Sequence, residues 1–176
     1  MNRRPLFLVA TLLSLLFLAS CATQLSNNPV QQVSNLASIR ADMLRQVNAA
    51  RREVGAPPLR FNAVMNAAAQ AHAEDMARRG YYSHRSPEGR DVANRWRAHG
   101  GGAWQAVGEN ILFCERCVPP SAQAQTFHAR WMQSPGHRRN ILRPDFEEFG
   151  FGMAMANGRI YAVETFVRQL PPGRAW

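Results

Sequence analysis

The chain has 176 residues, of which 46% are hydrophobic and 19% charged. This length and composition suit one globular domain and exclude a disordered chain, an α/β barrel and a two-domain dinucleotide-binding enzyme. The formal net charge is +9, and all 21 basic residues are Arg, so P-loop nucleotide binding and Schiff-base catalysis, which need Lys, are excluded. The positive charge favours anionic partners such as lipid headgroups or cell-wall polymers. The arginines form no stripe interleaved with aromatic residues, which argues against nucleic-acid binding.

Residues 1–20 have the pattern of an export signal. Two arginines near the N-terminus precede an apolar run over residues 6–18, which is shorter than the ~20 residues that a membrane-spanning helix needs. Small residues then lead directly to Cys21, and this arrangement resembles the lipobox of bacterial lipoproteins. The resemblance implies that Cys21 is acylated and becomes the mature N-terminus, with residues 21–35 as a polar tether to the domain at 36–176. Ala22 after the cysteine indicates the outer membrane, facing the periplasm, if the cell is Gram-negative.

Apolar residues at helical spacing predict helices in the first half of the domain. The first runs from Leu36 to Val54 and ends at a Gly-Ala-Pro-Pro sequence. The second starts after Asn62 as N-cap and ends at Arg79 before a glycine. A loop follows over 81–89, and a short helix is predicted over 91–99.

Strands dominate the second half, which we predict as strands over 107–114, 148–155 and 159–168 with one helix that opens at 119–121. Asn157-Gly158 joins the last two strands and is typical of a tight hairpin. The predicted fold class is therefore α+β, a three-layer α-β-α sandwich around a small, mainly antiparallel sheet.

Two cysteines remain in the domain, Cys114 and Cys117. Because the chain is expected to be exported to an oxidising compartment, a short-loop disulfide is the favoured prediction. A thioredoxin-like redox pair is less favoured since no βαβ pattern surrounds the two residues, and a zinc site would need further local ligands.

Several ordered motifs resemble the CAP superfamily of cysteine-rich secretory, antigen 5 and pathogenesis-related 1 proteins in its bacterial form. The match extends from about Asp42 to about Val167, and its motifs are YSHRSPEG at 82–89, GENI at 108–111, WMQSPGHR at 131–138, NIL at 140–142, AQAHAEDMA at 69–77 and FGFG at 149–152. The resemblance implies an α-β-α sandwich with a central cleft.

In that family the cleft holds two histidines and two acidic residues. Carried over to this chain, His84 and His137 match the histidines and Glu109 matches the first glutamate. Ser134 occupies the place of the second glutamate, so one carboxylate of the family pattern is missing. Three acidic residues without motif support are candidates to replace it: Glu115, Glu147 and Glu148.

The residues around His137 predict a helix start. Ser134 is expected at the N-cap and Pro135 at N1, so the N–H of His137 at N3 should donate to the Ser134 hydroxyl. The positive end of the helix dipole favours a neutral imidazole there, which is the form that ligates a metal. His84 and His137, with Glu109 or water completing the site, would suit a divalent cation, Zn²⁺ best. The alternative is a structural network in which Glu109 accepts from two histidines and joins the loops.

Other polar residues are assigned structural roles. His72 lies on an apolar helix face and is predicted to be a satisfied core histidine. Three further residues are interpreted as packing and loop-fixing groups: Asn110, Trp131 and Asn140.

Three functions follow from this sequence. The favoured one is a non-enzymatic binding module, anchored to the envelope membrane, that binds a lipid, peptide or cell-wall ligand. The second is a metal-assisted hydrolase, a peptidase or esterase, with Glu109 as candidate catalytic base. The third is a structural or interaction protein in which His84, Glu109 and His137 only hold the fold together.

Overall fold

The computed structural model describes residues 27–115 and 123–171. The predicted signal peptide at 1–20, the lipidated Cys21 and Cys117 lie outside these ranges, so the anchor and the disulfide stay predictions. The described residues form five helices and four strands, in the order α1 (Leu36–Glu53), β1 (Arg60–Phe61), α2 (Ala63–Arg79), α3 (Val92–Ala98), β2 (Trp104–Glu115), α4 (Gln123–Gln133), α5 (Pro135–Leu142), β3 (Glu148–Ala156) and β4 (Arg159–Gln169).

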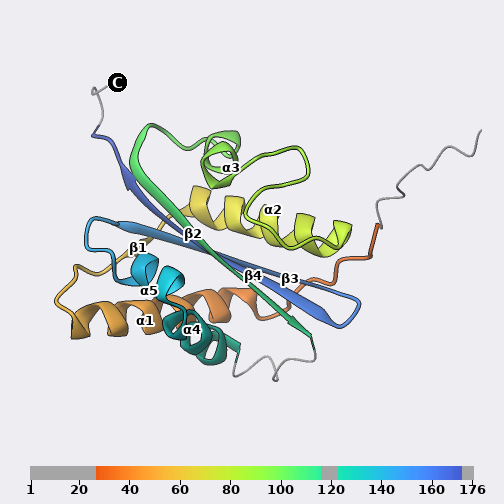
Figure 1. Ribbon diagram of the computed structural model, residues 1–176, viewed down its shortest axis with the longest axis horizontal. Coiled ribbons are helices and arrows are strands. Elements are labelled where there is room, and N and C mark those ends of the chain that lie inside the picture. The colour runs from red at the N-terminus through yellow and green to blue at the C-terminus, as the bar shows by residue number, and fades with distance from the viewer. Residues whose placement is uncertain (1–26, 116–122, 172–176) are drawn as a thin grey trace, which may run out of the picture.

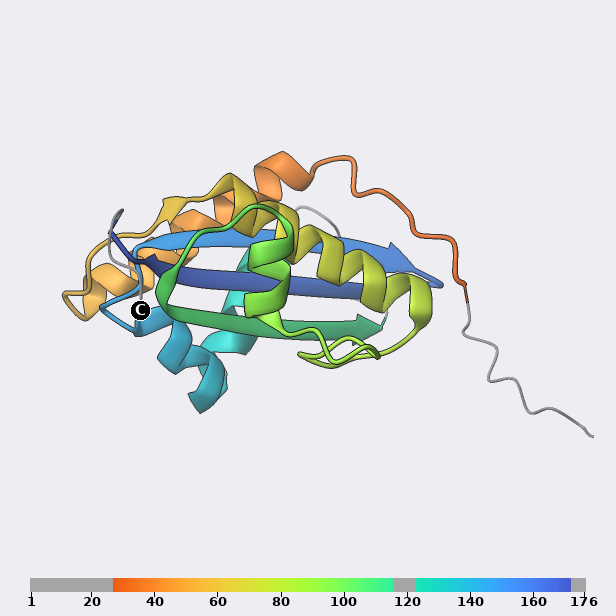
Figure 2. The same ribbon diagram turned by 90° about the horizontal axis from the view of Figure 1, so that it is seen from above.

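The strands make one sheet in the order β1-β3-β4-β2, with helices on both faces. Helices α2 and α3 cover one face, and α1, α4 and α5 cover the other (Figures 1 and 2). Pairing is antiparallel between β2 and β4 and between β3 and β4, whereas β1 pairs with β3 in parallel. The predicted three-layer α-β-α sandwich with a mainly antiparallel sheet is therefore confirmed, and the two-residue strand β1 was not predicted because it is too short to show a period.

Local capping explains the helix boundaries that the sequence predicted. The Asn62 side chain accepts from the N–H of Met65, and Gly80 ends α2 in the left-handed region with φ 70°. Asp91 and Asn94 form a reciprocal capping box at the start of α3. Asn157 and Gly158 both have positive φ, 52° and 71°, as the tight β3–β4 hairpin requires.

Two parts of the chain differ from expectation. Strand β2 begins at Trp104, three residues before the predicted strand, because its pairing with β4 extends to Gln169 through an irregularity between Trp104 and Ala106. Within the predicted tether, the backbone N–H of Asn28 donates to Arg78 O and that of Gln31 to Met155 O, both at 2.8 Å. The end of the tether therefore lies against the domain.

Helix α2 packs directly on β3 where that strand carries the alternating glycines of FGFG. A Cβ added to Gly150 would collide with the backbone at Met65 and Asn66, and one at Gly152 would collide with the backbone at Ala69 and Gln70. The small side chains of α2 and the missing side chains of β3 thus allow a close approach, which places His72 of α2 over the sheet.

Gly152→Ala is expected to lower the free energy of unfolding by about 1–3 kcal/mol, since helix and strand backbones must separate to admit the methyl group. Chemical denaturation would measure the loss. Gly136→Ala is the matched control, because a Cβ there would meet only the end of the Arg139 side chain, at 3.9 Å. Equal effects of the two substitutions would contradict the close-packing explanation.

No helix among residues 27–115 and 123–171 has the length and apolar character needed to cross a bilayer.

Candidate functional site

The predicted site residues gather around the edge strand β2. Successive side chains of a strand point to opposite faces, and Glu109 and Asn110 divide accordingly. Glu109, paired with Thr165, faces α2 and α3, whereas Asn110, paired with Glu164, faces α5. Groups from both helical layers therefore meet at this edge of the sheet.

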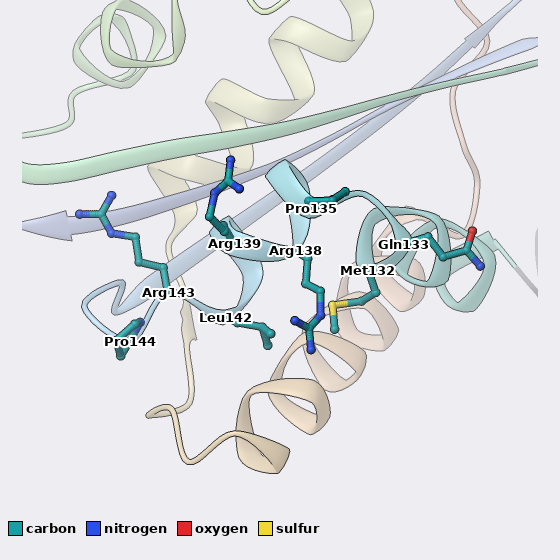
Figure 3. Close-up of a pocket in the computed structure, with 8 residues that line it drawn as sticks. All are labelled: Met132, Gln133, Pro135, Arg138, Arg139, Leu142, Arg143 and Pro144. Carbon is teal, nitrogen blue, oxygen red and sulfur yellow. The ribbon is translucent and has the colours of Figure 1, made fainter.

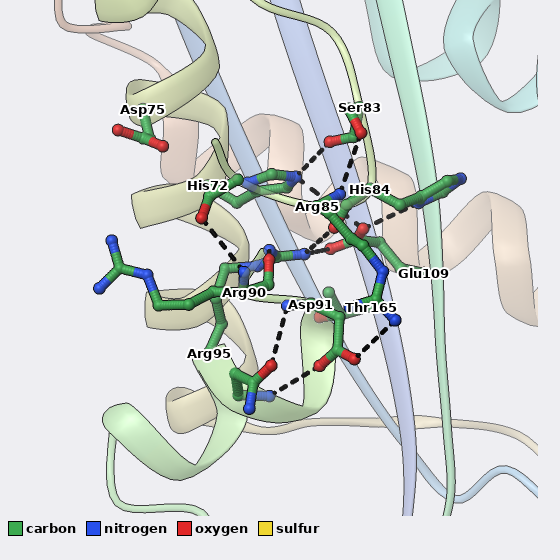
Figure 4. A network of polar contacts seen from close by, with 12 residues as sticks. His72, Asp75, Ser83, His84, Arg85, Arg90, Asp91, Arg95, Glu109 and Thr165 are labelled. Carbon is green, nitrogen blue, oxygen red and sulfur yellow. Dashed lines mark hydrogen bonds and ion pairs between the residues drawn. The ribbon is translucent and has the colours of Figure 1, made fainter. Parts of the chain in front are cut away.

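Glu109 is the buried centre of a polar network on the α2 and α3 side. Its carboxylate is 3% exposed, and its Oε2 accepts from Nη2 of Arg95 at 2.5 Å. Its Oε1 accepts from Nδ1 of His84 at 2.9 Å. The same Arg95 also donates to the carbonyls of His84, at 3.2 Å, and Arg90, at 2.8 Å (Figure 4). A single buried guanidinium thus neutralises Glu109 and holds the loop that carries His84.

Arg95 was not identified from the sequence. It lies in the seven-residue helix α3, next to the buried Trp96. Nothing in the local pattern distinguishes it from its exposed neighbour Arg97, since only the tertiary fold brings Glu109 against it.

His84 comes from the α2–α3 loop and is 55% exposed. Because Glu109 is acceptor-only when ionised, its bond to Nδ1 places the ring proton on that nitrogen in the neutral imidazole. The opposite edge of the ring points away from Arg95 and His72 (Figure 4). Nε2 is therefore the nitrogen with a lone pair available.

His137 reaches the same edge from the opposite helical layer. It is at N3 of α5, and its carbonyl accepts from Nδ2 of Asn110 at 3.0 Å. Burial lowers the pKa of His137, and the electrostatic influence of His84 lowers it further. The neutral imidazole expected from the sequence is thus favoured, with burial and His84 as the causes that the structure identifies.

His72 is the satisfied core histidine that was predicted. It is 1% exposed, and its Nε2 lies 2.9 Å from the carbonyl of Ser83. Burial lowers its pKa to about 4, with Arg95 acting in the same direction. Its Nε2 is also 3.9 Å from Oε1 of Glu109, a proximity that the sequence did not indicate.

The predicted capping bond of Ser134 is wrong. Ser134 is at the N-cap of α5 and Pro135 at N1, but the Ser134 side chain makes no capping hydrogen bond. Ser134 is the single residue between α4 and α5. Its backbone N–H donates to Trp131 O at 3.1 Å and its carbonyl accepts from the N–H of Arg138 at 2.8 Å, so the main chain itself joins the two helices.

The suggested replacements for the second family glutamate have partners elsewhere. Glu115 pairs with Arg159, Glu147 lies near Arg168, and Glu148 accepts from Asn62 and Gln169. A different carboxyl lies close to the site, that of Glu164 on β4, which is fully buried and accepts from Nδ2 of Asn110 at 2.7 Å. The sequence did not indicate it, because an acidic residue within a strand pattern is usually exposed.

Side chains from both layers also cover the outer edge of β2. The carbonyl of Ile111 accepts from the hydroxyl of Tyr82 at 3.0 Å and from the indole of Trp131 at 3.1 Å. The carbonyl of Glu109 accepts from Nδ2 of Asn140 at 3.2 Å. These bonds satisfy carbonyls that an edge strand would otherwise expose, and they explain the packing and loop-fixing roles predicted for Trp131 and Asn140.

The candidate donors for a metal are the two histidines, His84 and His137. Among residues 27–115 and 123–171, no group of three or more His, Cys, Asp or Glu side chains is arranged to hold an ion. Glu109 does not complete such a set, since Arg95 and His84 occupy its two oxygens. It accepts instead from Nδ1 of His84, and a carboxylate in that position commonly orients a histidine that ligates a metal.

A groove of about 620 Å³ lies on the outer side of α5. Its apolar part comes from Met132, Leu142 and two prolines, and three arginines surround it: Arg138, Arg139 and Arg143 (Figure 3). Arg138 extends beside Met132, whereas Arg139 points in another direction. Arg143 is bound to Asp145, while Arg138 and Arg139 have no ion pair within the described ranges.

The model of the cysteine-rich secretory protein family, CAP, matches residues 44–169 of this sequence. The chain belongs to the CAP family. The resemblance recognised from the motifs is thereby confirmed, and so is the fold that it implied.

Similar proteins and solved structures agree with this assignment. The uncharacterized protein YkwD of Bacillus subtilis is 27% identical over 134 residues, which are 76% of this chain and 49% of YkwD. An extracellular protein containing an SCP domain from Bacillus anthracis is 25% identical with a TM-score of 0.62, over 76% of this chain and 41% of that one. An outer surface protein from Borrelia burgdorferi shares the fold, with a TM-score of 0.67 at 12% identity, over 81% of this chain and 99% of that one. The chain spans about half the length of YkwD.

Two other structures of this fold were crystallised with metals. One is NaASP2 with Zn²⁺, with a TM-score of 0.55, 13% identity and coverage of 73% of this chain and 78% of that one. The other is manganese-bound Ac-ASP-7, with a TM-score of 0.51, 12% identity and coverage of 82% and 79%.

Proposed function

We propose that this protein is an exported, lipid-anchored CAP domain that binds a ligand at the cell envelope. The signal pattern over residues 1–20 and the lipobox at Cys21 support the anchor, and the extracellular description of the Bacillus anthracis relative supports export. The protein would then lie on a membrane without spanning it, since acyl chains on the N-terminal cysteine give stable attachment when two or more are present.

The cation part of the proposal depends on the bond between Glu109 and His84. That bond directs the lone pair of Nε2 outward, on the same edge of the sheet as the neutral imidazole of His137. His84 and His137 would hold the ion, with Zn²⁺ as the best match for two nitrogen donors and water. A bound cation would supply a Lewis-acidic position for an oxygen of the ligand.

The groove beside α5 supports the proposal that the ligand is an organic molecule. An apolar surface with two arginines that lack acidic partners among the described residues fits a molecule with both an apolar segment and a negative charge, as lipids, peptides and cell-wall fragments can provide. The candidate site and this groove share helix α5, in which His137 and the groove residue Arg138 are adjacent.

The geometry favours binding over hydrolysis. A general base must reach the proton that it removes, but the carboxylate of Glu109 is buried and both of its oxygens already accept from Arg95 and His84. We therefore assign Glu109 a positioning role.

Zinc should stabilise the purified chain from Ala22 onward through His84 and His137. At a zinc concentration 100-fold above Kd the expected gain is about 2.7 kcal/mol, seen as a rise in Tm by calorimetry. The double substitution His84→Ala and His137→Ala should remove the rise. His99→Ala, at an exposed histidine after α3, should leave it intact.

An unchanged rise in the double variant would exclude these two histidines as ligands. A double variant that is much less stable than the wild type without zinc would instead favour the structural alternative, in which the imidazoles mainly hold the loop and α5 in place.

A further inference from the structure

A buried hydrogen-bonded chain connects β4 to the helix that carries His137. Asn110 on β2 is fully buried, and its Nδ2 donates both to Oε1 of Glu164, at 2.7 Å, and to the carbonyl of His137, at 3.0 Å. Its Oδ1 accepts from Nδ2 of Asn140 at 2.8 Å. Both donors and the acceptor of the Asn110 amide are thus used, and two of the three bonds go to α5.

Glu164 and the carbonyl of His137 together fix which way the Asn110 amide faces. Its carboxyl points into the helical layer of α1, α4 and α5, on the same strand face as Ala162 and Phe166 and opposite Phe151 of β3. Because Oε1 of Glu164 and the carbonyl of His137 both accept from Asn110, the amide directs Nδ2 toward these two oxygens and Oδ1 toward Asn140. Without that acceptor, the Nδ2 group would lose one partner in a site where an unpaired polar atom is costly.

Other polar contacts at the first turn of α5 are few. The Ser134 side chain makes no capping bond, and the ring of His137 has no hydrogen bond to any described residue. The C-terminal end is held separately by Arg51, which donates to Ile141 O and Arg143 O. The carbonyl bond from Asn110 is therefore the side-chain contact that fixes the turn containing His137.

We propose that Glu164 is a positioning residue for the site, and that it sets the place of His137 through Asn110. It does not touch the ligand, because it is fully buried under α5. Burial also raises the pKa of Glu164 to about 8, so the group is mainly a neutral acid at neutral pH. Its Oε2 has no hydrogen-bond partner among the described residues, so the contact of this carboxyl with Asn110 is made by Oε1. This inference rests on the proposed function, in which His137 contributes to the site.

The test compares variants of the metal-free chain from Ala22 onward by NMR. Glu164→Gln keeps an acceptor oxygen for Asn110, whereas Glu164→Leu removes it. Asn110→Ala removes the hydrogen bonds to both Glu164 and the carbonyl of His137. The readouts are the imidazole proton shifts of His137 and the hydrogen exchange of the α5 amides relative to those of α2. We expect Glu164→Leu and Asn110→Ala to shift His137 and to speed α5 exchange about tenfold, as loss of a buried hydrogen bond predicts. Glu164→Gln should remain close to the wild type.

Phe151→Leu is the control for general loss of stability, because Phe151 lies opposite Glu164 in the same core. It should lower stability without a selective effect on α5. The proposal is overturned if Glu164→Gln disturbs His137 as much as Glu164→Leu does, or if Asn110→Ala has no more effect on α5 than Phe151→Leu. If Glu164→Leu does not fold, Asn110→Ala and Glu164→Gln decide the result. Zinc is absent from these measurements, so failure of the cation site is detected separately by the melting experiment with His84 and His137.

Discussion

Arg51→Met is expected to lower the free energy of unfolding by about 3–5 kcal/mol, because several buried carbonyls lose their donor and each unsatisfied group costs roughly 1–3 kcal/mol. Arg51 is 0% exposed although it carries a full charge. Burial lowers its pKa, and the charge of Asp145 offsets part of that effect. The loss on substitution should be measurable by urea or thermal denaturation.

The large effect follows from what the guanidinium binds. Arg51 donates to four backbone carbonyls, at 2.7 to 3.1 Å, and they belong to Pro57, Ile141, Arg143 and Phe146. Two of these carbonyls lie at the C-terminal end of α5, where helical carbonyls lack partners within the helix. Methionine would fill much of the space but would leave the buried carbonyls without donors.

The neighbouring Arg52 provides a matched control, since it is exposed on the same helix. Arg52→Met should change stability by no more than about 0.5 kcal/mol. The loss of stability for Arg51→Lys should fall between the two, because an ammonium keeps the charge but has three donors where the guanidinium has five. Similar losses for Arg51→Met and Arg52→Met would refute the role assigned to Arg51.

Glu164 should make the stability of the protein fall as the pH rises from about 4.5 to about 8. The carboxyl is fully buried, and burial raises its pKa in the folded protein from 4.5 to about 8. Between these values the folded chain keeps a proton that the unfolded chain has released. Since stability falls with pH wherever the folded state binds more protons, the loss accumulates over this interval and levels off above it.

Each pKa unit corresponds to about 1.4 kcal/mol, so this carboxyl can remove up to roughly 4 kcal/mol by pH 8. Glu164→Gln, which cannot ionise, should abolish that part of the pH dependence. The Gln variant should therefore be more stable than the wild type at pH 8 and similar to it at pH 5. Denaturation curves at a series of pH values would measure both.

Glu147→Gln is the control for the general effect of removing a carboxylate, because Glu147 is exposed. Its pH profile should resemble that of the wild type. Parallel profiles for the wild type and Glu164→Gln would show that Glu164 does not keep its proton in the folded state.

The position of the site was predictable in part. The resemblance to the CAP family indicated His84, Glu109 and His137, and the structure places them around one strand edge. The hydrogen bond predicted for Ser134 is absent, since its side chain makes no capping bond and Ser134 joins the two helices through its main chain. The residues that arrange the site, Arg95 and Glu164, were missed since their partners lie on other elements of the fold.

The sequence by itself determined the local features: helix limits at Asn62 and Gly80, the Asn157-Gly158 hairpin, the α+β class and the family. The helix limits, the hairpin and the fold class depend on a period or a backbone preference of adjacent residues, and the family depends on several ordered motifs. Only the tertiary structure decided that Arg95 neutralises Glu109 and that Glu164 is buried beside Asn110. It also decided that Arg51 donates to the carbonyls at the C-terminal end of α5. These contacts join segments distant in the chain, and their energies depend on burial, which no local pattern specifies.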